Sequence, residues 1–177
     1  MSSPNPAGRH RELMRTALAD WVTAQQIPGI GHVFASHRPD YNADEWPQSG
    51  GDCVALVRVV LPFESEDRAA YTGPEDAGGK DIHYSAELHV THRGFDPDDW
   101  PGIEDDYDRI IDALKDSLRG RGRDLGRPLA VFQVGELPRE GNITGAHDEP
   151  VEEEEAGLVT RHGVIAFTIT QYLQPST

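Results

Sequence analysis

The chain has 177 residues, and its 31 acidic side chains outnumber its 16 lysines and arginines, so its net charge is −15 at pH 7. This length fits one domain with a true core, and an apolar share of 37% argues against wholesale disorder. The charge excludes a basic surface for nucleic acid or anionic membranes, the single cysteine excludes internal disulfides, and no apolar stretch is long enough to span a membrane.

The N-terminal part of the chain predicts a helix followed by a short strand. Apolar residues recur at helical spacing over 9–26, and the Pro28-Gly29 pair ends the helix. The apolar segment 32–36 predicts a first strand. A loop is expected over 37–52, which is rich in Pro, Asp, Asn and Gly.

Two longer strands are predicted next. Residues 53–63 are apolar on both faces and rich in valine, which is typical of a central strand. Residues 81–93 alternate between apolar and polar side chains, which predicts a strand with one buried and one exposed face. The seventeen residues between them, 64–80, are expected to form a long loop.

The C-terminal half predicts one more helix and two more strands. Apolar residues over 101–119 keep the i, i+3, i+4 spacing of an amphipathic helix that begins at Pro101. Strands are expected at 129–134 and 163–173, with a long loop over 136–162. This order favours a single α+β domain over 1–177, with a mostly antiparallel sheet of about five strands and two helices packed on one face.

The negative charge is concentrated in two stretches. Residues 96–108 contain seven acids and no base, and residues 136–157 contain eight acids and one arginine. Solvated loops and an acidic helix N-terminus explain such stretches in many proteins. The alternative is a surface that repels DNA phosphates or meets a basic partner.

Motifs for catalysis and metal binding are poorly matched. The Gly79-Lys80 pair lacks both the leading glycine and the Ser or Thr of a phosphate-binding loop. His83 and His89 share a strand face but lie about 20 Å apart, too far to share one ion. There is no GxSxG elbow, and Cys53 begins a strand that is expected to be buried. We therefore expect no catalytic residue, no metal and no cofactor.

Residues 17–36, ALADWVTAQQIPGIGHVFAS, resemble the opening of tail terminator proteins of long-tailed (siphovirus-type) actinobacterial phages. The resemblance implies a structural virion protein that forms a ring, commonly of six copies, at the head-proximal end of the tail tube. Such a ring ends tube polymerisation and joins the tail to the head. The implied partners are further copies of the chain, the tail tube protein, a head–tail connector protein, and DNA that passes through the lumen without specific binding. No membrane partner is implied. The implied location is the tail–neck region of the virion, after synthesis in the host cytoplasm.

Two groups of residues are candidates for these contacts. Tryptophans in the similar polar segments 44–47 and 98–101 are typical of loops pinned to their own domain or of protein interfaces. The long segment 64–80 is expected to pack on a neighbouring subunit or on the tube. The expected subunit or partner interface comprises Trp46, Phe63, Tyr71, Lys80 and Trp100. The expected acidic lining of a DNA channel comprises Glu152, Glu153, Glu154 and Glu155.

Three other functions stay open at this point. A head–tail connector or neck adaptor would be similar in size and equally free of motifs. A small metal-dependent enzyme could use the carboxylates of 96–108. A protein that mimics DNA with its acidic face would bind a basic nucleic-acid enzyme.

Overall fold

The structure is a computed structural model. It describes residues 10–36, 55–69, 79–94, 96, 98–119, 131–134, 143–153 and 158–173. The helices are α1 (His10–Ala24) and α2 (Trp100–Arg119). The strands are β1 (Ile30–Phe34), β2 (Ala55–Ala69), β3 (Gly79–Gly94), β4 (Val131–Val134), β5 (Thr144–His147), β6 (Val151–Glu153) and β7 (Leu158–Leu173).

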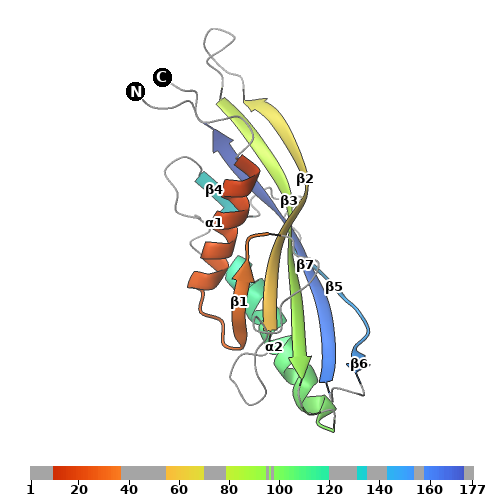
Figure 1. Cartoon of the computed structure of the whole chain (residues 1–177). Coiled ribbons are helices and arrows are strands. Elements are labelled where there is room, and N and C mark those ends of the chain that lie inside the picture. The colour runs from red at the N-terminus through yellow and green to blue at the C-terminus, as the bar shows by residue number, and fades with distance from the viewer. Residues whose placement is uncertain are drawn as a thin grey trace.

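The strands form one mixed sheet in the order β1-β2-β3-β7-β4, with β5 and β6 also pairing with β7. Among these pairs of described strands, β1 and β2 are parallel, and all the others are antiparallel. The long strands β2, β3 and β7 run along the molecule in Figure 1. Beside β7, the fifth position of the sheet is shared by β4, β5 and β6, which follow one another along its length. The predicted α+β fold is therefore confirmed.

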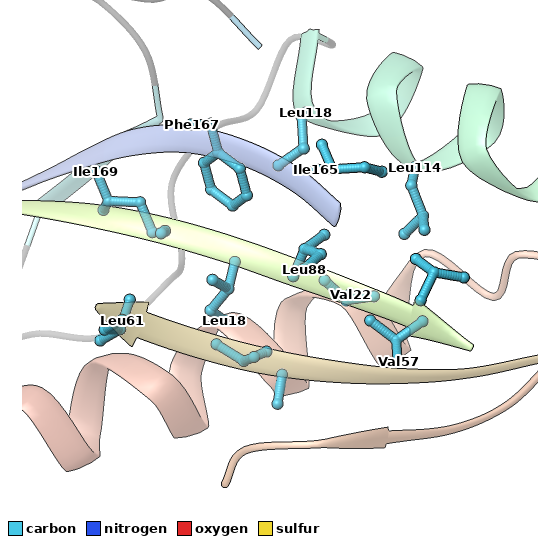
Figure 2. Close-up of a cluster of buried hydrophobic side chains, with 14 of the residues drawn as sticks. Leu18, Val22, Val57, Leu61, Leu88, Leu114, Leu118, Ile165, Phe167 and Ile169 are labelled. Carbon is cyan, nitrogen blue, oxygen red and sulfur yellow. The ribbon is translucent and has the colours of Figure 1, made fainter. Parts of the chain in front are cut away.

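The core lies between one face of the sheet and the two helices. α1 packs on β1 and β2, whereas α2 packs on β7 and β3. Leu18 and Val22 from α1 and Leu114 and Leu118 from α2 meet the inward side chains of β2, β3 and β7 (Figure 2). Inward side chains from Ile82 to Val90 are buried at every second position, as the alternation of this segment predicts.

Local hydrogen bonds explain where the helices begin and end. α2 starts one residue before Pro101, because Asp99 accepts a bond from the Gly102 N–H at 3.2 Å and caps the helix. After α1, Gln26 and Gly29 adopt positive φ angles of 50° and 95°. These two residues turn the chain from the helix into β1.

Two of the predicted loops are wrong in part. Residues 64–69 and 79–80 belong to β2 and β3, because the hairpin pairing continues from Glu64↔Tyr84 to Ala69↔Gly79. The predicted loop 136–162 contains β5, β6 and the start of β7, and β5 and β6 each pair with β7. These segments are short or polar, so their strand structure comes from pairing rather than from an apolar pattern. The predicted loop 37–52 lies outside the described residues.

Candidate functional site

The two acidic stretches of the sequence meet at one end of the sheet, where β3 ends and β7 begins. The first stretch leads into α2, whose Ile103 lies against Gly94 at the end of β3. The second passes along the start of β7, where the Asp148 N–H donates to the His162 carbonyl at 3.0 Å. We call this region the acidic end. Its described acidic side chains are exposed or half-buried: Asp96, Asp98, Asp99, Glu104, Asp105, Asp106, Asp108, Asp148 and Glu149.

A polar cluster lies beneath this end, between α2 and the sheet. The Tyr107 hydroxyl of α2 is 2.8 Å from Nδ1 of His147 in β5. It fits there because β7 has Gly163 at this position, and a Cβ on Gly163 would overlap the hydroxyl. Burial raises the pKa of Tyr107 to about 12, since the phenolate would lose its hydration. The hydroxyl is therefore a neutral hydrogen-bonding group that holds α2 to β5.

An arginine and a second histidine complete the cluster. Arg161 of β7 forms an ion pair with Glu104 of α2, and its guanidinium carbon lies 4.5 Å from the centre of the Tyr107 ring. His92 of β3 pairs with Arg161 across the sheet and is only 1% exposed. Neither ring nitrogen of His92 has a hydrogen-bond partner among the described residues. Burial lowers the pKa of His92 to about 4, so the ring is neutral near pH 7.

These contacts give the cluster a positioning role rather than a proton-transfer role. Burial keeps both side chains uncharged at neutral pH: Tyr107 is a protonated phenol, and His92 is a neutral imidazole. The Arg161 charge is balanced by Glu104 and by the ring face of Tyr107. The cluster therefore attaches the first turns of α2 to β3, β5 and β7. No group of three or more His, Cys, Asp or Glu side chains suited to a metal ion occurs among the described residues.

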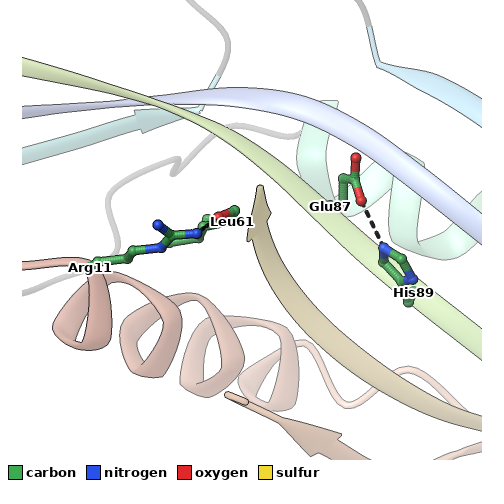
Figure 3. A network of polar contacts seen from close by, with 4 residues as sticks. All are labelled: Arg11, Leu61, Glu87 and His89. Carbon is green, nitrogen blue, oxygen red and sulfur yellow. Dashed lines mark hydrogen bonds and ion pairs between the residues drawn. The ribbon is translucent and has the colours of Figure 1, made fainter. Parts of the chain in front are cut away.

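The opposite face of the sheet carries polar pairs between neighbouring strands. His83 lies 3.0 Å from the Thr170 hydroxyl, and Thr91 lies 3.1 Å from Nδ1 of His162. Figure 3 shows the pair formed along β3 by Glu87 and His89, whose Oε2 and Nε2 are 2.7 Å apart. Neither described helix packs on this face, which we call the outer face. His89 lies on this face and His92 lies under α2, because residues three apart on a strand face opposite sides of the sheet.

The outer face also presents one large apolar side chain. The register of β2 and β3 shifts between Val60 and Phe63, so a bulge turns Phe63 outward opposite Ser85. Phe63 is 63% exposed. The Leu61 carbonyl, within the bulge, accepts a hydrogen bond from Arg11 of α1 (Figure 3). The bulge is thus held by α1 while the phenyl ring faces solvent.

The described members of the predicted interface lie at different parts of the sheet. Phe63 and Lys80 belong to the hairpin arms of β2 and β3, and Lys80 pairs with Arg68 and Leu173. Trp100, half-buried, is the first residue of α2 at the acidic end. The backbones of Glu152 and Glu153 lie at this same end, paired with Val159 and Leu158. Trp46, Tyr71, Glu154 and Glu155 lie outside the described residues.

Sequence reasoning did not find the polar cluster. Its members come from β3, α2, β5 and β7, and no short motif joins them. One signal was available, because His92 continues the buried alternation of Leu88 and Val90. A shallow hollow of about 130 Å³ lies elsewhere, between the end of α1 and β1. Neither of the two helices in the described part is long and apolar enough to cross a bilayer.

No family model matches this chain, and no curated protein matches its sequence.

Proposed function

We propose that the chain is a tail terminator: a ring-forming virion protein that ends polymerisation of a phage tail tube and offers a docking surface to the head connector. The observation that carries the proposal is the meeting of the two acidic stretches at one end of the sheet. The resemblance of residues 17–36 to the opening of such proteins supplies the class.

The acidic end suits the lumen of a ring through which DNA passes. Duplex DNA carries one negative charge per ~1.7 Å of its length, and lysines or arginines along its path would bind it by releasing counterions. The described acidic residues include members of both stretches. In addition to burial, the charges of Glu104 and Asp108 from the first stretch and of Asp148 from the second all raise the pKa of Tyr107, because all three lie near its hydroxyl. A surface of this sign repels phosphates and so leaves DNA free to slide.

The segment that carries the resemblance forms one structural unit. Residues 17–36 comprise most of α1, the turn with the two positive φ angles, and β1. Ala17, Leu18 and Val22 pack this unit against the sheet, while β1 pairs with β2. In this unit α1 contributes to the core, and β1 forms an edge of the sheet.

The proposal assigns the exposed surfaces to different partners. The hairpin arms of β2 and β3, with Phe63 of β2 exposed on the outer face, suit a contact with the tail tube protein, because apolar aromatic groups anchor protein interfaces. The acidic end lies at the other end of these strands, around the mouth of the lumen on the side that meets the head–tail connector. The mature location is the neck of the virion.

Self-assembly and tube binding test this function. Native mass analysis and negative-stain imaging of the purified chain, alone and with tail tube protein, should give closed rings that cap tube ends. A chain that binds portal-side proteins and not the tube is a neck adaptor instead. A chain that binds neither, and that gives heat in calorimetry with magnesium or manganese, is the metal-dependent enzyme.

Charge reversal tests the lumen assignment. Changing Glu152, Glu153, Glu154 and Glu155 to Lys should leave rings intact but slow DNA passage, measured as loss of infectivity at normal virion yield. The matched control reverses four acidic residues that are exposed on the helices away from this end: Glu12, Asp20, Asp112 and Asp116. Equal infectivity of both variants contradicts the assignment.

A further inference from the structure

One edge of the sheet is formed by β1, and β5 forms the middle of the opposite edge, between β4 and β6. Within the described part of the chain, the ladder of β1 is with β2 and that of β5 is with β7. Gly31 and His32 are exposed on β1, and every residue of β5 is exposed. An exposed strand edge presents backbone N–H and C=O groups that can pair with another chain.

These two edges lie at the same level along the sheet. One row of paired residues runs directly across it: Val33, Val57, Val90, Gly163 and His147. The next row starts at His32 and passes through Leu56, Thr91 and His162. It ends at Asp148, whose N–H bonds to the His162 carbonyl. Neither edge is displaced along the strands relative to the other.

The directions and faces of the two edges are also complementary. β1 is parallel to β2, and three antiparallel steps then lead through β3 and β7 to β5, so β5 runs opposite to β1. Rotation of a second copy about an axis along the strands keeps those directions, so its β5 would meet β1 antiparallel. Val33 and His147 then share the helix-covered face, and His32 and Asp148 share the outer face.

We propose that copies of this chain join by pairing β1 of one copy with β5 of the next, with His32 opposite Asp148. The contact uses two different surfaces, so it is head-to-tail, and such contacts close into a ring when the rotation permits. The inference rests on the proposed function for the existence of a ring and specifies how that ring is built. The charge of Asp148 complements the imidazole of His32, which can donate a hydrogen bond.

The surface beside β1 suits an added strand. The hollow of about 130 Å³ borders this edge and is lined by Val22, Thr23, Gln26, Ile27, Ile30, Gly31, His32 and Val33. Strand addition gains affinity from main-chain hydrogen bonds, and hollows beside an edge receive alternate side chains of the added strand. The neighbouring copy thus finds a backbone edge with room beside it for the side chain of its His147.

Disulfide trapping tests the pairing directly. His32→Cys and Asp148→Cys are introduced together, with Cys53→Ser, so that the two new thiols are the only ones in the chain. Residues directly opposite on antiparallel strands have Cα atoms about 4.5–5.5 Å apart, a separation that a disulfide spans. Mild oxidation should give a ladder of linked copies that ends at the ring size. The matched control carries Ser65→Cys in place of His32→Cys, on the hairpin arm, and should give no ladder.

Charge exchange tests the contact between His32 and Asp148. His32→Asp alone places two carboxylates together, and Asp148→Lys alone removes the complementary charge, so each should weaken self-association by about tenfold. Mixing the two variants should restore association, because each junction then has a carboxylate facing a lysine or a histidine. Far-ultraviolet circular dichroism of each variant checks that the monomer is folded.

The outcomes separate this inference from the proposed function. Rings that bind the tail tube but give no ladder and no rescue on mixing overturn the edge pairing and leave the terminator function in place. A ladder and a rescue in a protein that does not bind the tube support the edge pairing and overturn the terminator function. A monomer that gives no ladder at any concentration, with or without tube protein, overturns both.

Discussion

The two faces of the sheet formed by β2, β3 and β7 differ in polarity and burial, because successive side chains along each strand point to opposite faces. Along β3, the side chains from Ile82 to Val90 that face the helices are apolar and buried, whereas those between them include His83, Glu87 and His89. Burial stabilises the folded chain by roughly 25 cal/mol per Å² of apolar surface. Partly exposed polar pairs such as Glu87–His89 contribute only about 0–1 kcal/mol.

The comparison teaches that stability and association occupy different surfaces of one sheet. The covered face is constrained by packing against α1 and α2, so its residues cannot change without cost. On the outer face, Leu56 and Phe34 are buried near β1, whereas Phe63, Glu64 and Ser65 on the hairpin arm are exposed. These exposed residues and the strand edges can be used for contacts with other copies or with the tube. Polar groups also lie on the covered face, as in the polar cluster around Tyr107 and in the bond that the Tyr84 hydroxyl donates to Gln171.

The largest effect on stability is expected in the centre of the covered face. Leu88→Ala removes a fully buried side chain and should lower the free energy of unfolding by about 2–5 kcal/mol. The matched outer-face variant is Ser85→Ala, three residues away on the same strand. It should change the free energy by about 0.5 kcal/mol or less, as measured by urea denaturation. Similar losses in both variants would refute the division between the two faces.

The buried histidine should make stability depend on pH. The pKa of His92 falls from 6.5 to about 4 on folding, so the unfolded chain binds the proton more tightly. The contribution of His92 to the free energy of unfolding is fully present above pH 6.5, where the ring is neutral in both states. It is lost as the pH falls toward 4, and the total loss is about 3 kcal/mol.

His92→Leu isolates this contribution. It should remove that part of the pH dependence, seen as the difference between the two denaturation profiles over this range. Burial also lowers the pKa of His162, and this effect is common to both proteins. Parallel profiles would show that His92 is not the group responsible.

The close approach of α2 to β7 gives a smaller effect. Gly163→Ala places a methyl group where the Tyr107 hydroxyl lies, so the ring must shift and the free energy of unfolding should fall by about 1–3 kcal/mol. Tyr107→Phe removes the hydroxyl and, combined with Gly163→Ala, should recover part of that loss. The measurement is a double-mutant cycle by urea denaturation, and strictly additive losses would contradict the contact.

The smallest effect on stability is expected at Phe63. Phe63→Ser replaces a ring that is 63% exposed, so the free energy of unfolding should change by about 0.5 kcal/mol or less. Binding to tail tube protein should nevertheless weaken, which a pull-down or calorimetry would detect. Unchanged binding would remove Phe63 from the proposed tube contact.

The sequence predicted the elements whose pattern is local. The periodicity of 101–119 and the alternation of 81–93 each name the residues that the structure buries. The strand segments 64–69 and 144–147 were missed because they are polar and are exposed or paired at an edge. The first residue of α2 was missed because Asp99, rather than Pro101, sets the helix start.

The candidate site likewise combines features that the sequence predicts with features that only packing decides. The two acidic stretches were evident from composition, but their meeting depends on the packing of α2 against the end of β3 and on the path of β5 along β7. The burial of His92 follows from the same packing.

By itself, the sequence determined the two helices, the inward faces of the long strands and the concentration of charge, because each depends on residues that are close together in the chain. The tertiary structure decided that β1 is parallel to β2, that β1 and β5 lie level at opposite edges, and that the acidic stretches adjoin. These features depend on hydrogen-bond register and packing between residues distant in the chain, which no local periodicity encodes.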